Sequence, residues 1–334
     1  MATFTQFDPA DVQSNLTAQK VTSGLWSNGS TLDGTTGLGF FTASTQGATT
    51  ESFYHIYDYS STDSNAKVQF DIAYGHYAGS GSTKEAGATD GLTPTRAVYS
   101  QWRNLLLEPG TKKFTVNGSE TNDIYILNVA RNRYKQKLNV GSLELHISGA
   151  ANPLKLIDDS TINPAVQVNG LDTYKIVSGT IAGGVVSTAN DQEFGVLYPD
   201  EGVIVLGSTE LDASASLATL RTSETNVDNH GNLFNHISAS NYFSGKSEEL
   251  LKSSYYFVRV KNGDYNFTSN PTFVSGSVAN GIFRFQSMIG DPQVYITTIG
   301  LYNSNNELLA VGKLSKPLLK NKSRELLVRV KLDY

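Results

Sequence analysis

The stretch DIYILNVARNRYKQKLNVGSLELHISG, residues 123–149, contains the pattern that decides the fold. Its first seven residues are almost continuously apolar, which is typical of a strand that is buried on both faces. Residues 143–147 alternate between apolar and polar side chains and predict a second strand. Gly141 lies between the two, and glycine readily adopts the left-handed backbone that a tight turn requires. The stretch therefore predicts a strand, a connector, a turn and a second strand.

Four cations occupy alternate positions of the connector: Arg131, Arg133, Lys135 and Lys137. An extended backbone would place all four on one face, about 6–7 Å apart, whereas a helix would spread them around its circumference. Such a series suits a nucleic acid, a small anion or an acidic surface of a neighbouring protein. The net charge of the chain is -5 and Tyr134 is the one aromatic residue among the cations, which is unlike a nucleic-acid-binding segment. The sequence therefore favours subunit contact.

The composition predicts a mainly β protein. Of the 334 residues, 39% are hydrophobic and only 17% are charged. Low charge with many β-branched residues, tyrosines and glycines favours strands and turns over helices. At this length we expect several domains, mainly β with a few short helices, built from antiparallel, sandwich-like sheets. Cysteine is absent, which excludes disulfides, cysteine zinc ligands and cysteine nucleophiles.

The sequence contains no pattern that predicts membrane insertion or secretion. The first residues lack the basic region and apolar core of a signal peptide. No apolar run approaches the roughly 20 residues that a membrane-spanning helix needs. We therefore expect no membrane partner.

Charge and composition predict four segments along the chain. Residues 1–50 form an extended arm, and residues 51–150 form an α+β domain that contains the basic connector. Residues 151–250 form an acidic, β-rich middle domain with 4 Lys/Arg against 13 Asp/Glu, and residues 251–334 form a basic β domain with 11 against 5. An acidic middle and a basic end favour complementary contacts between subunits.

The N-terminal arm is predicted from its polarity. Asp8 suits the N-cap and Pro9 the first position of a short helix. After Trp26 the sequence becomes rich in serine, glycine and threonine and cannot build a core of its own. We expect this part to order against another surface, with Phe40 and Phe41 as its anchors.

Periodicity predicts the remaining elements. An amphipathic helix is expected at 95–107, from the spacing of residues such as Val98, Trp102 and Leu105. Pro199 and Gly202 are residue types that favour a turn between two strands. The predicted strands and hairpins cover residues 53–59 with 68–74, 193–206, 255–261, 294–302 with 308–314, and 325–332, and a short helix is expected at 213–220. The strand at 255–261 directs Arg259 and Lys261 outward.

Catalytic and metal-binding patterns are weak. The five histidines form no H-x-H or H-E-x-x-H pair, which favours structural roles: His55, His76, His146, His230 and His236. Three carboxylate pairs occur: Asp158-Asp159, Asp200-Glu201 and Glu248-Glu249. Cleavage of a glycosidic bond would need two carboxylates about 5–9 Å apart in a cleft, which sequence spacing does not define. We expect no enzyme activity, no cofactor and no bound metal.

Several long segments resemble one family of viral proteins. The chain is similar to virion structural proteins of T4-like contractile-tailed phages, including those of marine cyanophages. The segments that carry the resemblance are 72–82 (IAYGHYAGSGS), 95–107 (TRAVYSQWRNLLL), 123–131 (DIYILNVAR) continuing through Lys137-Leu138 and Gly141, 193–206 (EFGVLYPDEGVIVL), and the run from 255 to 334 with LSKP at 314–317. The first 50 residues contribute nothing to it.

The resemblance implies a structural role in the virion tail. It implies a baseplate (wedge) protein, made in the host cytoplasm, that contacts other tail proteins and is present in multiple copies that follow the sixfold symmetry of the tail. It implies no nucleic-acid partner. Two alternatives remain: a neck or fibre-attachment protein of the same virion, and a tail protein that binds or degrades carbohydrate. The candidate assembly interface consists of Arg131, Arg133, Lys135, Lys137, Phe40, Phe41, Arg259 and Lys261.

Overall fold

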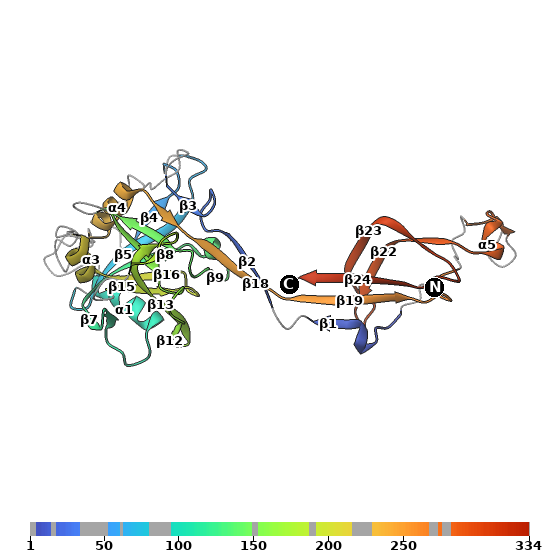
Figure 1. Ribbon diagram of the computed structural model, residues 1–334, viewed down its shortest axis with the longest axis horizontal. Coiled ribbons are helices and arrows are strands. Elements are labelled where there is room, and N and C mark those ends of the chain that lie inside the picture. The colour runs from blue at the N-terminus through green and yellow to red at the C-terminus, as the bar shows by residue number, and fades with distance from the viewer. Residues whose placement is uncertain are drawn as a thin grey trace. The chain divides into compact units, whose positions relative to one another are not determined.

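The computed structural model (Figure 1) divides the chain into two compact units. We call Lys20–Leu250 the sheet unit, and Met1–Gln19 together with Leu251–Tyr334 the terminal unit. The structure describes residues 5–14, 18–33, 53–60, 63–79, 95–148, 153–186, 192–215, 229–266, 273–275 and 282–333. Strands dominate both units and pair antiparallel, so the prediction of a mainly β fold with a few short helices is confirmed.

One large antiparallel sheet organises the sheet unit. In spatial order its strands are β3 (Thr31–Leu32), β17 (Phe243–Ser244), β10 (Glu144–Ile147), β11 (Leu154–Asp158), β13 (Leu171–Thr180), β15 (Glu193–Tyr198), β16 (Val203–Gly207), β8 (Asp123–Val129), β5 (Val68–His76) and β4 (Tyr54–Tyr57). Two short strands, β12 (Val166–Val168) and β14 (Gly184–Val185), pair with β13 beside this path. Residues 51–150 and 151–250 therefore contribute neighbouring strands to one sheet.

Smaller elements surround this sheet. Two small sheets are formed by β2 (Gln19–Gly24), β18 (Lys246–Leu251) and β9 (Lys137–Leu138), and by β6 (Phe114–Val116) with β7 (Ser119–Thr121). The helices are α1 (Thr95–Leu106), α2 (Arg131–Tyr134), α3 (Ser208–Ala215) and α4 (Asn229–Ser240). The predicted helix at 213–220 thus begins earlier, at Ser208, and its later residues lie outside the described part of the chain.

Strand β8 lies inside the sheet and is buried on both faces, as its apolar run predicts. Tyr125 and Leu127 point into one hydrophobic core, and Ile124 and Ile126 point into the other. Each of these four side chains is completely buried. Successive side chains of an extended backbone point to opposite faces of the sheet. A continuously apolar strand is therefore buried on both faces.

Helix α1 supplies the cover of one face of the sheet by packing on β5. Its buried residues include Val98, Tyr99 and Trp102. Leu105, which the spacing assigned to the apolar side, is exposed instead. The helix is therefore rotated toward Tyr99, whose hydroxyl donates a hydrogen bond to the carbonyl of Thr121 at 2.8 Å.

Residues 20–33 belong to the sheet unit. Leu25, Trp26 and Leu32 are buried in the core on the second face, which α4 also covers. The indole Nε1 of Trp26 donates a hydrogen bond to the carbonyl of Phe243 at 2.8 Å. Phe40, Phe41 and the rest of residues 34–52 lie outside the described residues.

The terminal unit consists of short sheets. One contains β1 (Val12–Ser14), β19 (Ser253–Val260) and β24 (Leu326–Asp333), and the two-stranded sheets are β22 (Val294–Tyr302) with β23 (Leu308–Lys320) and β20 (Val274–Ser275) with β21 (Ile282–Phe283). A 3-10 helix spans Pro9–Asp11, and α5 spans Ser287–Gly290. The predicted N-cap is present, because Oδ1 of Asp8 accepts a hydrogen bond from the amide of Ala10 at 3.2 Å.

Candidate assembly surfaces

The basic connector is not an extended strand. Residues Arg131–Tyr134 form one turn of helix, and Lys135 then adopts a left-handed backbone with φ 57°. Only Lys137 lies in a strand, β9. Because the backbone changes direction twice within seven residues, the four cations do not share one face. The extended alternative, with a row of charges 6–7 Å apart, is wrong.

The two arginines of the connector have different surroundings. Arg131 is exposed, and its guanidinium lies over the ring of Tyr134, 4.8 Å from the centroid. Arg133 is half-buried, and its Nε donates a hydrogen bond to the carbonyl of Val68 at 3.4 Å. Burial lowers the pKa of Arg133, and the carboxylate of Asp58 opposes that shift. Arg131 is therefore the more accessible of the two to a partner.

The lysines of the connector bind carboxylates of the same unit. Lys135 Nζ lies 2.6 Å from Glu249 Oε2, and Lys137 Nζ lies 3.6 Å from Glu248 Oε1. Lys20, on β2, lies 2.6 Å from the other oxygen of Glu248. The side chain of Glu248 is buried while its lysine partners are partly exposed. These ion pairs hold β9 and β2 on either side of β18, so this part of the basic series stabilises the sheet unit itself.

Substitutions of Glu248 and Arg131 distinguish a residue that stabilises the sheet unit from one that is accessible to a partner. We expect Glu248→Gln to lower the free energy of unfolding by about 1–2 kcal/mol, because two lysines lose a hydrogen-bonded charge while water still screens them. We expect Arg131→Ser to change it by less than about 0.5 kcal/mol, as for other exposed side chains. Urea unfolding followed by circular dichroism measures both. Equal effects of the two substitutions would contradict the internal role of Glu248.

The two cations predicted on the last strands lie in the terminal unit. Arg259 is exposed on β19, and its Nη2 lies 3.5 Å from Asp11 Oδ1. Lys261, which directly follows β19, is exposed as well. The predicted outward orientation of both side chains is confirmed. They remain available to a partner, although Asp11 partly neutralises Arg259.

His76 and His146 lie beside carboxylates, and His146 also stacks on an aromatic ring. His76 Nε2 is 3.1 Å from Asp123 Oδ1, and both side chains are buried. His146 Nε2 is 2.7 Å from Glu144 Oε1, and its ring stacks on Tyr242 with a centroid distance of 4.3 Å. Within the described part of the chain, no three His, Asp or Glu side chains come together as a metal site would require.

Two carboxyl groups on α3 are poorly solvated. Burial raises the pKa of Asp212 to about 6. Burial also raises the pKa of Glu210, to which the charge of Glu193 adds a smaller effect. Oδ1 of Asp212 and Oε2 of Glu210 are buried and have no hydrogen-bond partner among the described residues. Burial therefore disfavours the ionised form of both carboxyl groups in the folded chain relative to the unfolded chain.

The raised pKa of Asp212 predicts a pH-dependent stability. Because the folded pKa of about 6 exceeds the value near 3.9 in an unfolded chain, the contribution is fully present below about pH 4 and is lost as the pH rises through 6. Two pKa units correspond to roughly 3 kcal/mol, which solvent screening of this half-exposed group reduces to about 1 kcal/mol.

Asp212→Asn should therefore raise the free energy of unfolding at pH 8 by about 1 kcal/mol and leave it unchanged at pH 4. Denaturant unfolding at the two pH values measures this difference. Glu108→Gln, at an exposed position, serves as the matched control and should alter neither value. An Asp212→Asn variant with the wild-type pH profile would refute the assignment.

The terminal unit has an unusually small core. Among its described residues only Val260, Ile299 and Leu301 are buried hydrophobic side chains. Large hydrophobic side chains are exposed in far greater number: Val12, Tyr265, Ile282, Phe285, Ile289, Tyr295, Tyr302, Leu308, Leu309, Val311 and Leu327. Extensive exposed apolar surface in a folded protein marks an interaction site. The apolar side chains on these strands are therefore left exposed by the other described residues of the unit.

The end of the β22–β23 hairpin concentrates this exposed surface. Tyr302, Leu308, Leu309 and Val311 are 44–68% exposed, and we call these four residues the hairpin patch. The intervening turn is well ordered, because Oδ1 of Asn303 accepts hydrogen bonds from the amides of Asn305 and Glu307, each at 2.9 Å. The hairpin patch is therefore held on a defined scaffold.

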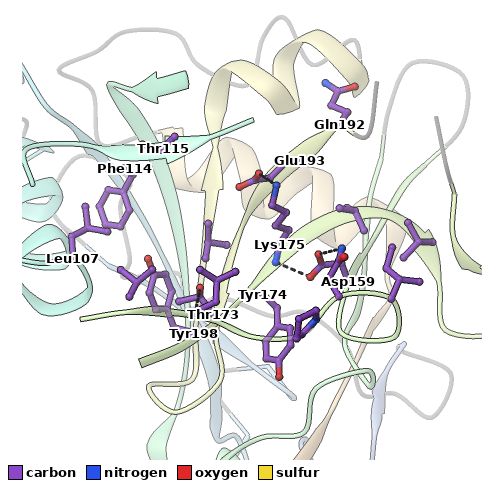
Figure 2. Close-up of a pocket in the computed structure, with 18 of the residues that line it drawn as sticks. Leu107, Phe114, Thr115, Asp159, Thr173, Tyr174, Lys175, Gln192, Glu193 and Tyr198 are labelled. Atoms are coloured by element: carbon purple, nitrogen blue, oxygen red, sulfur yellow. Dashed lines mark hydrogen bonds and ion pairs between the residues drawn. The ribbon is translucent and has the colours of Figure 1, made fainter. Parts of the chain in front are cut away.

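The sheet unit contains a large open groove, drawn in Figure 2. We call it the sheet groove; its volume is about 740 Å³. The floor is the face of β13 and β15 that α1 leaves uncovered, and it includes Val177 and Val196. Exposed aliphatic residues such as Ile162, Val166 and Val186 line it as well. The groove is thus an apolar surface of the sheet that lacks a covering layer.

Polar groups gather at one end of the sheet groove. Figure 2 shows Leu107, Phe114 and Tyr198 on one side of the groove, and Lys175, Glu193 and Asp159 farther along it. Lys175 Nζ lies 3.0 Å from Glu193 Oε2. The backbone amide of Lys175 and the side-chain amide of Asn163 both donate hydrogen bonds to the carboxylate of Asp159, at 2.9 and 2.8 Å. These groups are bonded to one another and leave the apolar floor as the main binding feature.

Tyr174, which lines the sheet groove, lies near several carboxylates. Burial raises the pKa of its hydroxyl, and Asp172, Asp158, Asp159 and Asp200 raise this pKa further. Charged side chains of both signs line the groove itself: Lys113, Lys175, Asp159 and Glu193.

Sequence reasoning did not identify either surface. The hairpin was predicted from its alternation, yet the run Leu308-Leu309-Ala310-Val311 contains more apolar residues than one buried face can accept, and that excess was the available signal. The sheet groove is formed by segments far apart in the chain, such as 107–115 and 162–177. No local pattern brings these segments together.

Comparison with known proteins identifies no relatives: no family model, no curated protein and no solved structure matches the chain. Among the helices that the structure describes, none is long and apolar enough to cross a bilayer.

Proposed function

We propose that this chain is a structural component of a contractile phage tail, located in the baseplate of the virion, and that it acts through contacts with neighbouring subunits. The proposal excludes catalysis as its role. Its partners are other tail proteins and further copies of the chain. The resemblance of residues 72–82, 95–107, 123–141, 193–206 and 255–334 to virion structural proteins supports the tail assignment.

The observation that carries the assembly role is the small core of the terminal unit. Burying an aliphatic or aromatic side chain stabilises a fold by about 1.5–3 kcal/mol, and only three such side chains are buried among the described residues of this unit. Ordering its strands costs conformational entropy of about 1–2 kcal/mol per residue. When neighbouring subunits bury the exposed apolar side chains of these strands, the free energy gained by burial offsets that entropic cost.

Sheet edges provide a second route to assembly. Strand β24 pairs with β19 along one edge, and no strand among the described residues pairs with its other edge. Arg329 and Lys331 point to the outer face of β24 and are exposed. Cations on an edge strand oppose pairing with a like-charged strand and favour an acidic one. The edge thus selects its neighbour by charge.

Isolation of the virions of the phage that encodes the chain tests the proposal. We expect the chain in purified tails by mass spectrometry, and we expect a density map of the tail to place it in the baseplate with the strands of the terminal unit covered by neighbouring subunits. Absence from virions, together with no binding of the purified chain to tail components, would refute the proposal. Placement at the neck or at a fibre would correct its location.

A further inference from the structure

The hairpin patch and the sheet groove are complementary in polarity. The patch exposes four apolar side chains beside a defined turn, and the groove is lined by the exposed aliphatic residues Ile162, Val166 and Val186. A volume of about 740 Å³ lies within the range of about 300–1,000 Å³ that holds a drug-sized ligand. Such a volume accepts a few side chains of a hairpin and excludes a whole domain.

The two units that carry these surfaces have opposite net charges. The sheet unit contains 15 Lys/Arg against 24 Asp/Glu, and the terminal unit contains 11 against 7. The groove itself is lined by Asp159 and Glu193 together with Lys113 and Lys175, so the complementarity lies in the net charges of the two units. Close to the patch, Lys313 and Lys316 are exposed on β23, and Glu307 is exposed beside Leu308. Opposite charges around apolar contacts accelerate association and select the correct orientation.

From this complementarity we propose that the hairpin patch of one copy binds in the sheet groove of a second copy. Each copy presents one patch and one groove, and the two are different surfaces. The contact is therefore heterologous, and repetition of it produces a ring if the rotation closes or a filament if it does not. The proposal rests on the assembly role above and names one of its interfaces.

The groove favours a protein segment over a small polar ligand. The polar side chains at its end, including Lys175, Glu193 and Asn163, are bonded to groups of the same unit. The apolar part is bordered by β12 and β14, two short strands that pair only with β13 among the described strands. Their outer edges present backbone donors and acceptors to an extended chain, as in strand addition.

Sedimentation velocity of the full chain over a range of concentrations tests the proposal. We expect the wild-type chain to form species larger than a dimer as its concentration rises. Leu309→Asp in the patch and Val166→Asp in the groove should each weaken self-association about 30-fold or more, the effect of removing a central contact residue. Their matched controls are Ile282→Asp and Leu105→Asp, at exposed positions outside both surfaces, and both should associate as the wild type does.

Mixing the two interface variants gives the sharpest result. The Leu309→Asp chain keeps a working groove and the Val166→Asp chain keeps a working patch, so the mixture should form 1:1 pairs and nothing larger. A symmetric interface that uses one surface twice would not be restored by mixing. Thermal unfolding of each variant, expected to match the wild type because both positions are exposed, shows that the fold is intact.

Three results would overturn this inference. They are a monomeric wild-type chain at every concentration, a mixture of the variants that stays monomeric, and controls that dissociate as strongly as the interface variants. A monomeric chain that is nevertheless present in purified tails would overturn the self-contact alone and leave the tail assignment standing. Absence from tails would instead refute the tail assignment.

Discussion

Trp26→Ala should lower the free energy of unfolding of the sheet unit by about 3–5 kcal/mol, the usual cost of truncating a buried tryptophan. The indole is only 3% exposed. Its ring centroid lies 4.8 Å from that of Phe243 and 5.8 Å from that of Phe70. Alanine would leave a cavity where β3, β17 and β5 contribute to the same core, and neighbouring strands cannot collapse to fill it.

A second substitution at this position separates the contribution of ring packing from that of the hydrogen bond. Trp26→Phe keeps most of the ring contacts and removes the hydrogen bond to Phe243, so we expect a loss of about 1–2 kcal/mol. Urea unfolding followed by circular dichroism measures both variants. A loss below about 1 kcal/mol for Trp26→Ala would mean that residues 20–33 detach from the sheet unit as a free arm would.

The second large effect is expected at Gly202, in the turn between β15 and β16. Its φ of 69° lies in the left-handed region, and an added Cβ would be 2.3 Å from Cε1 of Tyr134. Tyr134 is buried, so its ring has no free direction in which to move. Gly202→Ala should lower the free energy of unfolding by about 3–4 kcal/mol, from backbone strain and forced repacking together.

Gly170 offers a matched control for this substitution. Its φ is 76°, and nothing lies within 4 Å of an added Cβ. Gly170→Ala should therefore lower the free energy of unfolding only through backbone strain, by about 1–2 kcal/mol. The difference between the two alanine variants measures the contact of the turn with Tyr134. Equal losses at both positions would show that this contact contributes nothing.

Local sequence patterns predicted the elements with strong periodicity or specific turn chemistry. Strand β8 was predicted because residues 123–129 are almost continuously apolar. The turn at 199–202 was predicted because proline and glycine favour the backbone conformations of turns. The hairpin at 294–314 was predicted from its alternation, and its second strand, β23, continues beyond the predicted end to Lys320 through Pro317. These signals need no information from distant parts of the chain.

The basic connector shows where local reasoning fails. Alternate cations are compatible with a strand, yet Arg131–Tyr134 turn into a helix because Tyr134 is buried beside Gly202. The ion partners of its lysines, Glu248 and Glu249, are more than 100 residues away in the sequence. Their pairing depends on sheet topology. The charge pattern identified the cations that form ion pairs, but it did not show that their partners lie within the same unit.

Composition near the N-terminus did not define the surface against which this segment orders. Residues after Trp26 are polar enough to predict an arm that orders against another surface, and Leu32 among them is buried where it pairs with Phe243 of β17. Burial of a few apolar residues decides the location of such a segment, whatever the average polarity around them. The opposite holds in the terminal unit, where apolar strands remain exposed.

Hydroxyl-radical footprinting of the chain, free in solution and within purified tails, tests most directly the claim that the terminal unit is completed by neighbouring subunits. The account predicts that Tyr295, Tyr302, Leu308 and Leu309 are oxidised in the free chain and protected in tails. Leu105, exposed on α1, serves as the internal reference. Equal oxidation of the four residues in the two states would contradict the account.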